Sequence, residues 1–259
     1  MSKEVTATIV TFKGYDKAKK AIESLIEYTK GVSLEIFVVD NASGDETAKR
    51  LIEDFPSIKV IENKENKGFG YGHNTVLPLL QSKYHLIVNP DIMITKDVVS
   101  ELALYLDEHK DVGIVTPKVL NIDGTDQDLP KRLPVVASLI GRRILKKALR
   151  KQVEHYQMKD ADLLEATEIE FSTGCFFMIR TELFKKLKGF DTRFFLYYED
   201  IDLSRRVGKE MKVIYYPSTY IYHLWERSSA HTLKYFLILV QGMFKYFTKW
   251  GWKFLYKNL

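Results

Sequence analysis

The amino-acid sequence predicts an α/β fold: a mostly parallel sheet covered by helices, followed by a C-terminal amphipathic helical extension. The first observation is that apolar, often β-branched runs alternate with helical patterns through residues 5–120. The second is that acidic residues follow the ends of such runs, at Asp40 and Asp91. The carboxyl ends of parallel strands line the ligand crevice of an open α/β sheet, so these carboxylates mark a candidate site.

The alternation begins with a strand at residues 5–12, a helical pattern at 18–30 and a second strand at 34–40. A helix is expected after Asp45, because Ser43, Gly44 and Asp45 form a loop suited to capping it. Further along the chain we expect a strand at 58–63, a helix within 67–80, a strand at 84–90, a helix at 97–110 and a strand at 113–120. Strands that alternate with helices imply a parallel sheet covered on both faces.

Residues 121–166 break this pattern and form a long insertion. Regularity returns afterwards, with strand-like runs at 169–180 and 213–217 and helical patterns near 181–187 and 199–206. The chain is 46% hydrophobic, which is enough for a core, and no Pro/Gly/Ser-rich linker divides it. We therefore expect one domain over residues 1–230, followed by a helical contact segment at 231–259.

The cysteine content and the hydropathy of the chain indicate the cellular compartment. Cys175 is the only cysteine, so no intrachain disulfide forms, which fits a reducing compartment. Its apolar neighbours predict an inert buried thiol. The first residues lack the pattern of a signal peptide, and the most apolar stretch, residues 235–244, is far shorter than the ~20 residues that span a bilayer. We expect a cytoplasmic protein without a transmembrane segment.

The first two candidate binding segments follow early strands. Asp40 is placed to accept a hydrogen bond from the imide N–H of uracil or thymine, but a turn or helix-capping role is equally open. The segment Asn66–Asn74 contains alternating glycines, including Gly68, that let backbone N–H groups approach phosphate or sugar. A left-handed turn would also use glycine here. The segment matches neither a dinucleotide-binding fingerprint nor a P-loop.

The remaining candidates are acidic residues and a histidine. Pro90 stops the strand before Asp91, which makes this carboxylate a candidate ligand for a divalent cation that bridges a diphosphate, or else a turn residue. Glu199 and Asp200 precede an amphipathic helix, where capping is the alternative role. The aromatic residues upstream of this pair predict a partly dehydrated wall. His223 follows a predicted strand and is either structural or a ligand.

Taken together, these segments resemble glycosyltransferase family 2, inverting enzymes with a single nucleotide-diphospho-sugar-binding domain of the Rossmann-like GT-A fold. The resemblance runs from about Val5 to His223. It is strongest at residues 9–13, 38–47, 66–74 with 89–91, and 189–206, the last being the most specific.

The resemblance implies a role for each matching residue. Asp200 is the catalytic base with Glu199 beside it, Asp40 binds the base of the donor, and Asp91 coordinates a Mg²⁺ or Mn²⁺ ion with the diphosphate. Metal or diphosphate binding is implied for His223. Contacts to the donor are implied for Thr11, Asn66, Gly68, Asn74, Asn89 and Arg206. One departure is that the common metal motif has two aspartates flanking one residue, whereas the first position here is Asn89, which puts strict metal dependence in doubt.

The form of these motifs is most similar to bacterial rhamnosyltransferases of surface polysaccharide synthesis. This implies transfer of L-rhamnose from dTDP-β-L-rhamnose to a lipid-linked, polyprenyl-diphosphate glycan acceptor. A family member that uses a UDP-hexose and a non-catalytic partner of a membrane-bound transferase remain as alternatives. A sugar-1-phosphate nucleotidyltransferase is a poor match, because residues 11–20 lack its glycine-rich, basic loop.

Two basic segments predict contact with a membrane. Basic pairs at 142/143, 146/147 and 150/151 alternate with apolar pairs, which predicts one amphipathic helix on an anionic surface. At the C-terminus, a lysine stripe accompanies aromatic residues, as at membrane interfaces, and consists of Lys245, Lys249, Lys253 and Lys257. We expect a peripheral protein at the inner face of the plasma membrane. The alternative is a helix packed on the domain or on a second subunit, as in a homodimer. Nucleic-acid binding is not expected, since no reading module is present.

Overall fold

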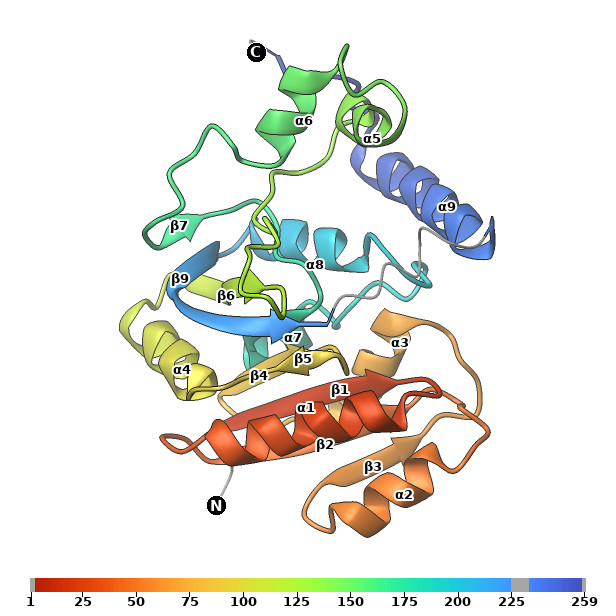
Figure 1. The fold of residues 1–259 in the computed structure, drawn as a ribbon, viewed down its shortest axis with the longest axis vertical. Coiled ribbons are helices and arrows are strands. Elements are labelled where there is room, and N and C mark those ends of the chain that lie inside the picture. Colours follow the sequence, from red (N-terminus) through yellow and green to blue (C-terminus); the bar gives the residue numbers. More distant parts are fainter. Residues whose placement is uncertain (1–2, 225–232, 258–259) are drawn as a thin grey trace.

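The protein is described here from a computed structural model, which covers residues 3–224 and 233–257 without the side chain of Arg143. Its centre is a nine-stranded sheet with the strand order β3-β2-β1-β4-β8-β6-β9-β5, and β7 pairs with β9 (Figure 1). The strands are β1 Val5–Thr11, β2 Leu34–Asp40, β3 Lys59–Glu62, β4 Tyr84–Val88, β5 Ile92–Met93, β6 Val112–Leu120, β7 Thr167–Glu168, β8 Phe176–Arg180 and β9 Lys212–His223.

Most of these strands run in one direction. β1 is parallel to β2 and β4, and β2 is parallel to β3. β8 lies antiparallel between β4 and β6, so β6 and its parallel partner β9 again follow the direction of β1. β5 and β7 pair antiparallel with β9. The expected mostly parallel sheet is confirmed, and the carboxyl ends of β1, β2 and β4 meet at one edge.

The helices cover both faces of the sheet. They are α1 Tyr15–Tyr28, α2 Thr47–Asp54, α3 Phe69–Asn74, α4 Val98–Glu108, α5 Val136–Arg143, α6 Arg150–Tyr156, α7 Thr181–Lys186, α8 Glu199–Val207 and α9 Leu233–Trp250, with a short 3-10 turn at Leu77–Leu79. In β2, Ile36 and Val38 join the core cluster of α1 and α4, while Phe37 and Val39 join the cluster on the opposite face. Burial on both faces explains why the strand is a continuous apolar run.

The insertion differs from its prediction. The single amphipathic helix expected over residues 141–151 is wrong, because α5 ends at Arg143 and α6 begins at Arg150. At Gly141 a Cβ atom would lie 2.8 Å from side-chain carbons of Leu149 and Val153, so the two helices fold back closely on one another at this glycine. The exposed residues Lys146 and Lys147 lie between the helices and do not continue one cationic face.

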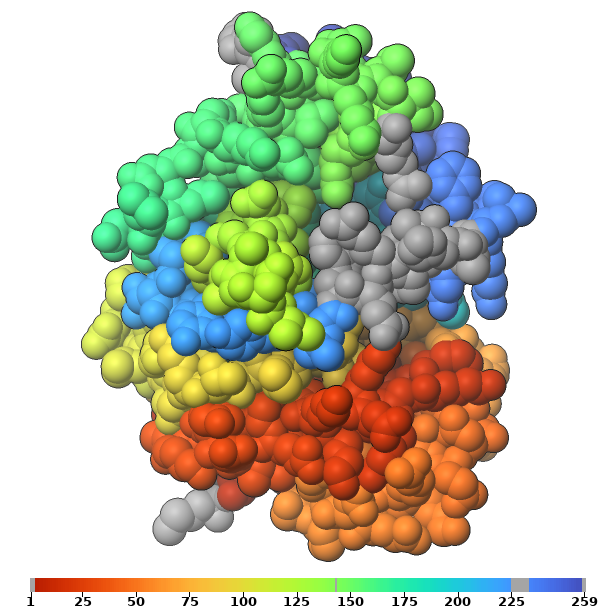
Figure 2. All heavy atoms as spheres, viewed as in Figure 1, coloured from red at the N-terminus to blue at the C-terminus, as the bar shows by residue number. Residues whose placement is uncertain are grey.

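The C-terminal helix packs on the domain. Tyr246 and Phe247 of α9 are buried in a third apolar cluster with Phe194, Tyr198 and Ile201. This is the arrangement of the alternative in which the helix covers the domain. Figure 2 shows the insertion and the C-terminal residues at one end of the molecule, with the N-terminal half at the other.

The predicted lysine stripe is wrong. The helix ends at Trp250 because Gly251 adopts a positive φ of 90°, so the two later lysines leave the helical face. Lys249 turns inward, with its ammonium 2.7 Å from a carboxylate oxygen of Asp191. The boundary predicted between residues 230 and 231 lies outside the described residues. Within the described ranges, no helix combines the length and the apolar character that a bilayer span requires.

Candidate functional site

The ends of four strands bring the predicted residues to one edge of the sheet. Thr11 and Asp40 are register partners at the ends of β1 and β2. β4 ends at Val88, immediately before Asn89 and Asp91, as the proline between them predicts. His223, the last residue of β9, pairs with Ile92 next to Asp91. The sequence therefore places these side chains at one end of the sheet, and the structure joins them there.

Asp40 holds the turn that follows β2. Its carboxylate is 2% exposed and accepts hydrogen bonds from the Ser43 backbone N–H, at 3.1 Å, and from the Ser43 hydroxyl. This geometry fits the turn role that was the alternative to base binding, and the base contact stays a prediction. Beside it, the buried Thr11 hydroxyl has no hydrogen-bond partner in the described part of the chain.

Asn41, which was not among the site residues predicted from the sequence, connects the glycine-rich segment to the end of β2. The amide of Asn41 donates to Asn66 Oδ1 at 3.2 Å and to the carbonyl of Gly68 at 3.0 Å. Asn66 Oδ1 also accepts the Gly68 N–H at 3.0 Å. The only available signal for Asn41 was its place directly after Asp40. These contacts fix the loop that enters α3.

Gly68 allows this loop to touch the segment that leads to the acidic pair. Its φ is +101°, and a Cβ atom here would lie 2.0 Å from the carbonyl oxygen of Phe195. The same carbonyl accepts the Phe69 N–H at 2.9 Å. The glycine is therefore required by close backbone packing, while its predicted contact with phosphate or sugar stays a prediction.

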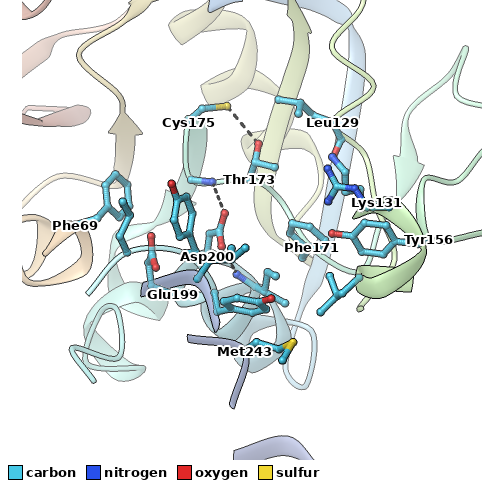
Figure 3. Close-up of a pocket in the computed structure, with 18 of the residues that line it drawn as sticks. Phe69, Leu129, Lys131, Tyr156, Phe171, Thr173, Cys175, Glu199, Asp200 and Met243 are labelled. Atoms are coloured by element: carbon cyan, nitrogen blue, oxygen red, sulfur yellow. Dashed lines mark hydrogen bonds between the residues drawn. The ribbon is translucent and has the colours of Figure 1, made fainter. Parts of the chain in front are cut away.

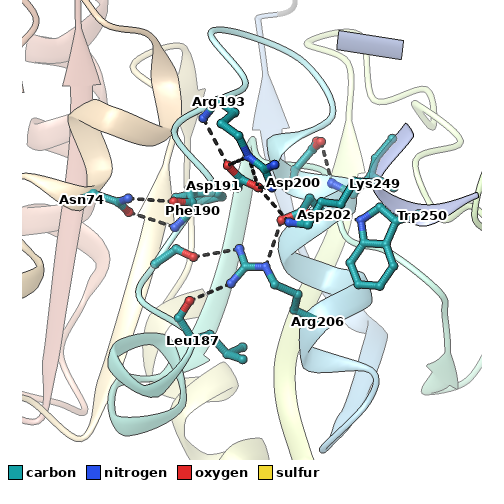
Figure 4. Close-up of polar contacts among 12 residues, drawn as sticks. Asn74, Leu187, Phe190, Asp191, Arg193, Asp200, Asp202, Arg206, Lys249 and Trp250 are labelled. Atoms are coloured by element: carbon teal, nitrogen blue, oxygen red, sulfur yellow. Dashed lines mark hydrogen bonds and ion pairs between the residues drawn. The ribbon is translucent and has the colours of Figure 1, made fainter. Parts of the chain in front are cut away.

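Asn74 has a structural role. Its side-chain amide donates to the carbonyl of Phe190 at 2.8 Å and accepts the Phe190 N–H at 2.9 Å, as Figure 4 shows. Both polar atoms of this side chain thus hold the loop that precedes the acidic pair. The donor contact expected of Asn74 finds no support in this geometry.

Arg206 acts in the same region from the last turn of α8. It donates to the carbonyls of Leu187 and Gly189, each at 2.8 Å, and to the carboxylate of Asp202 at 2.9 Å. Its guanidinium therefore ties α8 to the loop at residues 187–189 (Figure 4), and it is absent from the lining of the cavity described next. The predicted donor contact of Arg206 is likewise unsupported.

A cavity of about 520 Å³ lies between the insertion, α8 and α9 (Figure 3). Its polar lining includes Asn89, His223, Glu199 and Asp200. Most of the remaining wall is apolar and is formed by Phe69, Leu129, Leu139, Ile140, Ile144, Phe171, Leu196, Phe236, Leu239, Val240 and Met243. The cavity joins the strand ends to the acidic pair, which combines a polar reaction centre with a dehydrated wall.

The two neighbouring carboxylates differ in environment. Asp200 is partly exposed, and its oxygens accept the N–H groups of Gly174 at 3.0 Å and Ile201 at 2.8 Å. Burial raises the pKa of Asp200, but these two N–H groups oppose the rise. Glu199 is 4% exposed and its Oε2 has no described partner. Burial and then the charge of Asp200 raise the pKa of Glu199 well above its ordinary value. Ionisation is therefore more favourable at Asp200 than at Glu199.

The backbone before this pair is strained. Tyr197 and Tyr198 both line the cavity and have positive φ values of 69° and 70°, a conformation that is costly for a bulky residue. On α9, a Cβ atom at Gly242 would lie 2.8 Å from the Tyr198 ring, so only a glycine leaves room for it. The C-terminal helix thus supports the turn that points the acidic pair into the cavity.

Asp91 and His223 form the part of the site that fits a metal ion. His223 Nε2 lies 3.3 Å from Asp91 Oδ1, a buried oxygen with no well-oriented hydrogen bond among the described groups. Burial acts to raise the pKa of Asp91, but the proximity of the His223 ring outweighs it and keeps that pKa below its ordinary value. Gln127 of the insertion contacts His223 Nδ1 at 3.0 Å and orients the ring.

These donors suit a cation that is shared with a diphosphate. One carboxylate and one imidazole, with the Asn89 amide lining the same cavity, leave most coordination positions for substrate oxygens. In the described ranges, no group of three or more His, Cys, Asp or Glu side chains gathers into a closed metal site. Cys175 also lines the cavity, and its predicted burial is confirmed. Burial raises its pKa to about 12, which disfavours the reactive thiolate.

Three curated proteins resemble the chain over much of its length. An N-acetylglucosaminyl-diphospho-decaprenol L-rhamnosyltransferase of Mycobacterium tuberculosis is 23% identical over 73% of this chain and 66% of its own length. The low-salt glycan biosynthesis hexosyltransferase Agl10 of Haloferax volcanii is 27% identical over 75% of this chain and 59% of its own length. Rhamnosyltransferase WbbL of Escherichia coli is 23% identical over 60% of this chain and 60% of its own length. The chain thus spans less than two thirds of the length of each.

Solved structures and a family model agree on the fold. GalNAc-T7, crystallised with UDP, GalNAc and Mn²⁺, superposes with a TM-score of 0.67 and 16% identity over 88% of this chain and 44% of its own. The mannosyltransferase PcManGT of Pyrobaculum calidifontis, in complex with GDP-Man and Mn²⁺, superposes with a TM-score of 0.63 and 18% identity. This match covers 96% of this chain and 64% of the mannosyltransferase. These neighbours show the expected GT-A fold. The model of the family described as Glycosyl transferase family 2 matches residues 6–188. The chain therefore belongs to glycosyl transferase family 2.

Proposed function

We propose that this protein transfers a sugar, with inversion, from a nucleoside-diphosphate donor to a hydroxyl group of a glycan acceptor. The observation that carries the proposal is the Asp200 carboxylate, held by two backbone N–H groups and open to a cavity that Asn89 and His223 also line. A base in that position removes the proton of an acceptor hydroxyl, while the side chains at the strand ends bind the donor.

The reaction follows from the two ends of the cavity. Asp200 takes the proton of the acceptor hydroxyl as its oxygen attacks the anomeric carbon, and the bond between that carbon and the diphosphate breaks on the opposite face. Burial raises the pKa of Glu199, which disfavours a second negative charge beside the base. A Mg²⁺ or Mn²⁺ ion bound by Asp91 and His223 would supply positive charge for the leaving diphosphate.

For the donor we propose dTDP-L-rhamnose, and for the acceptor a lipid-linked glycan. The names of the Mycobacterium and Escherichia relatives support rhamnose, and the diphospho-decaprenol in the first of them supports the lipid. The Haloferax relative is named only as a hexosyltransferase, so UDP-hexoses are the competing donors.

We also propose that the protein works at the inner membrane surface. The insertion and α9 expose apolar side chains, with Ile144 77% and Leu237 57% exposed, and Lys146 and Lys147, which follow Ile144 in the sequence, are also exposed. Apolar residues with adjacent cations suit a surface of anionic lipids. If so, replacing Ile144 and Leu145 with serine lowers co-sedimentation with anionic vesicles, and unchanged sedimentation would remove this surface from the proposal.

The donor is tested by calorimetric titration of the purified protein with dTDP-rhamnose, UDP-glucose, UDP-galactose, UDP-N-acetylglucosamine and GDP-mannose, with and without Mn²⁺. Selective, metal-assisted binding of dTDP-rhamnose is the expected result. Preference for a UDP-sugar would keep the enzyme class and replace the sugar. Failure to bind any donor would refute the transferase function and favour a non-catalytic partner of a transferase.

A further inference from the structure

The insertion places a buried lysine in the wall of the cavity. Lys131 is 7% exposed, and its ammonium donates only to two neutral groups, the carbonyls of Asp128 at 3.2 Å and Leu129 at 3.4 Å. No carboxylate in the described part of the chain forms an ion pair with it. The charges of Asp200 and Asp128 favour the ammonium, but a buried charge without an ion pair is poorly compensated, so an anionic ligand would stabilise it.

A second cation lies close to the first. Arg142 of α5 also lines the cavity, with its guanidinium carbon 5.6 Å from the centre of the Tyr156 ring. Burial, and then the positive charge of Arg142, lower the pKa of Lys131 to about 8, so the lysine is still mostly protonated at neutral pH. Arg142 is exposed, whereas Lys131 is buried. The two like charges repel each other, and an anion bound between them would relieve the repulsion and the poor solvation of Lys131.

The position of the pair relative to Asp200 separates it from the donor end. Figure 3 shows Lys131 with Tyr156 and Phe171 on one side of Asp200, and Phe69 with Glu199 on the other. Phe69 belongs to the glycine-rich segment that is tied to β2 and the strand ends. Lys131 therefore faces the base from the opposite side, where an acceptor would enter.

The apolar wall continues from the cavity to the surface. Ile140, Ile144 and Phe236 line the cavity and are also 38%, 77% and 42% exposed. Deeper in, α9 contributes Val240 and Met243 to the lining. A ligand with a long apolar chain could lie along this wall and leave the cavity at the exposed end, whereas a nucleotide donor has no group for it.

We propose that Lys131 and Arg142 bind the diphosphate of a polyprenyl-diphosphate acceptor, while the wall formed with α9 binds the first part of its apolar chain. The inference rests on the proposed function, which places the transfer chemistry at Asp200. The two cations could bind the diphosphate of the donor as well as that of the lipid. The apolar wall favours the lipid, because only the lipid has an apolar chain that would bind to it.

The test measures binding to the full-length protein by calorimetry, with farnesyl diphosphate as a short prenyl diphosphate and with inorganic diphosphate and farnesol as its two halves. We expect the wild type to bind farnesyl diphosphate more tightly than either half. Lys131→Met and Arg142→Met each lose a charge-assisted contact and weaken this binding by about tenfold or more. Lys159→Met is the matched control, since this exposed lysine of the insertion is absent from the cavity lining, and its binding stays within twofold of wild type.

Two further measurements separate the lipid from the donor. Val240→Thr should weaken farnesyl diphosphate and leave inorganic diphosphate unchanged, because it alters only the apolar wall. Binding of dTDP and UDP should change less than twofold in the Lys131 and Arg142 variants. If these variants lose the nucleotide instead of the prenyl diphosphate, the cations serve the donor and the proposal is overturned.

A wild type that binds the nucleotide but not farnesyl diphosphate would also overturn the acceptor site, and would leave the proposed function standing. Loss of nucleotide binding in the wild type itself would count against the proposed function. Equal urea midpoints for wild type and variants show that each variant is folded, so a loss of binding can be read as a loss of contact.

Discussion

The ammonium of Lys249 lies 2.6 Å from Oδ1 of Asp202, whose side chain has no exposed surface. The indole N–H of Trp250 donates to the same oxygen at 2.7 Å. Asp202 lies two residues after Asp200 on α8, so the end of α9 is attached to the helix that carries the base (Figure 4). The C-terminal helix is therefore part of the framework of the site.

Replacing Lys249 with methionine should lower the free energy of unfolding by about 1–3 kcal/mol, because Asp202 would lose one partner for a fully buried charge. Arg206 and Trp250 still contact that carboxylate, which limits the loss. Urea unfolding measures the effect. Lys234→Met, at an exposed position of the same helix, should change stability far less, and equal effects of the two changes would show that the ion pair contributes nothing.

Asp200→Asn should reduce sugar transfer roughly 100- to 10,000-fold, because the amide cannot accept the proton of the acceptor hydroxyl. Donor affinity should stay within a few-fold of wild type, since asparagine keeps the size of the side chain and removes only its ability to take a proton. Single-turnover product formation and calorimetry measure the two quantities. Near-normal turnover in this variant would remove Asp200 from the role of base.

Glu199→Gln should change how stability depends on pH. The pKa of Glu199 is raised in the folded protein, so above its ordinary value of 4.5 the unfolded chain releases a proton that the native state keeps. Wild-type stability should therefore fall as pH rises through this window, and glutamine should remove that contribution to the slope. Urea unfolding at pH 5.5 and pH 8 compares the proteins. Parallel pH curves would mean that Glu199 is ionised in the fold.

Gly68→Ala should destabilise the protein far more than Gly124→Ala. Both glycines have positive φ values, 101° and 83°, so both changes incur the conformational cost of about 1 kcal/mol. At Gly68 the new methyl group would also overlap the Phe195 carbonyl at 2.0 Å, whereas nothing lies within 4 Å at Gly124. Thermal unfolding of both variants tests this, and similar losses would show that the loop moves freely away from residue 195.

Asn89→Asp should strengthen Mn²⁺ binding in the presence of a nucleoside diphosphate by several-fold, because it adds a carboxylate near Asp91. His223→Ala should weaken it, since the imidazole is one of the two donors that face each other. Titration followed by electron paramagnetic resonance of Mn²⁺ measures binding without turnover. If neither change alters affinity, the metal is not bound at this pair.

Local patterns predicted much of the fold. The period of apolar residues identified the strands from β1 to β4 and β6, and Asp97 caps α4 by accepting the Ser100 N–H, close to where the helix was expected. Such signals depend on neighbours two to four residues apart, so they are visible in one sequence. The same logic placed Asp40 and Asp91 at strand ends, which in a parallel sheet meet at one edge.

Contacts between distant residues left no such signal. The side-chain amide of Asn74 forms a hydrogen bond with Phe190, which is 116 residues away in the sequence. Gln127 orients the ring of His223, which is 96 residues away in the sequence. Lys131 had no motif to distinguish it from other surface lysines. Its burial in the cavity depends on how the insertion packs over α8, which no short pattern encodes.

The sequence by itself determined the α/β class, the order of the acidic residues along the chain and their place after strands, because strand period and strand ends are local properties. Only the tertiary structure decided that Glu199 and Asp200 have different environments, since the Gly174 N–H group that contacts Asp200 and the burial of Glu199 are supplied by other segments. It also decided that Lys249 faces the domain and not a membrane, because the buried charge of Asp202 attracts it more strongly than solvent does.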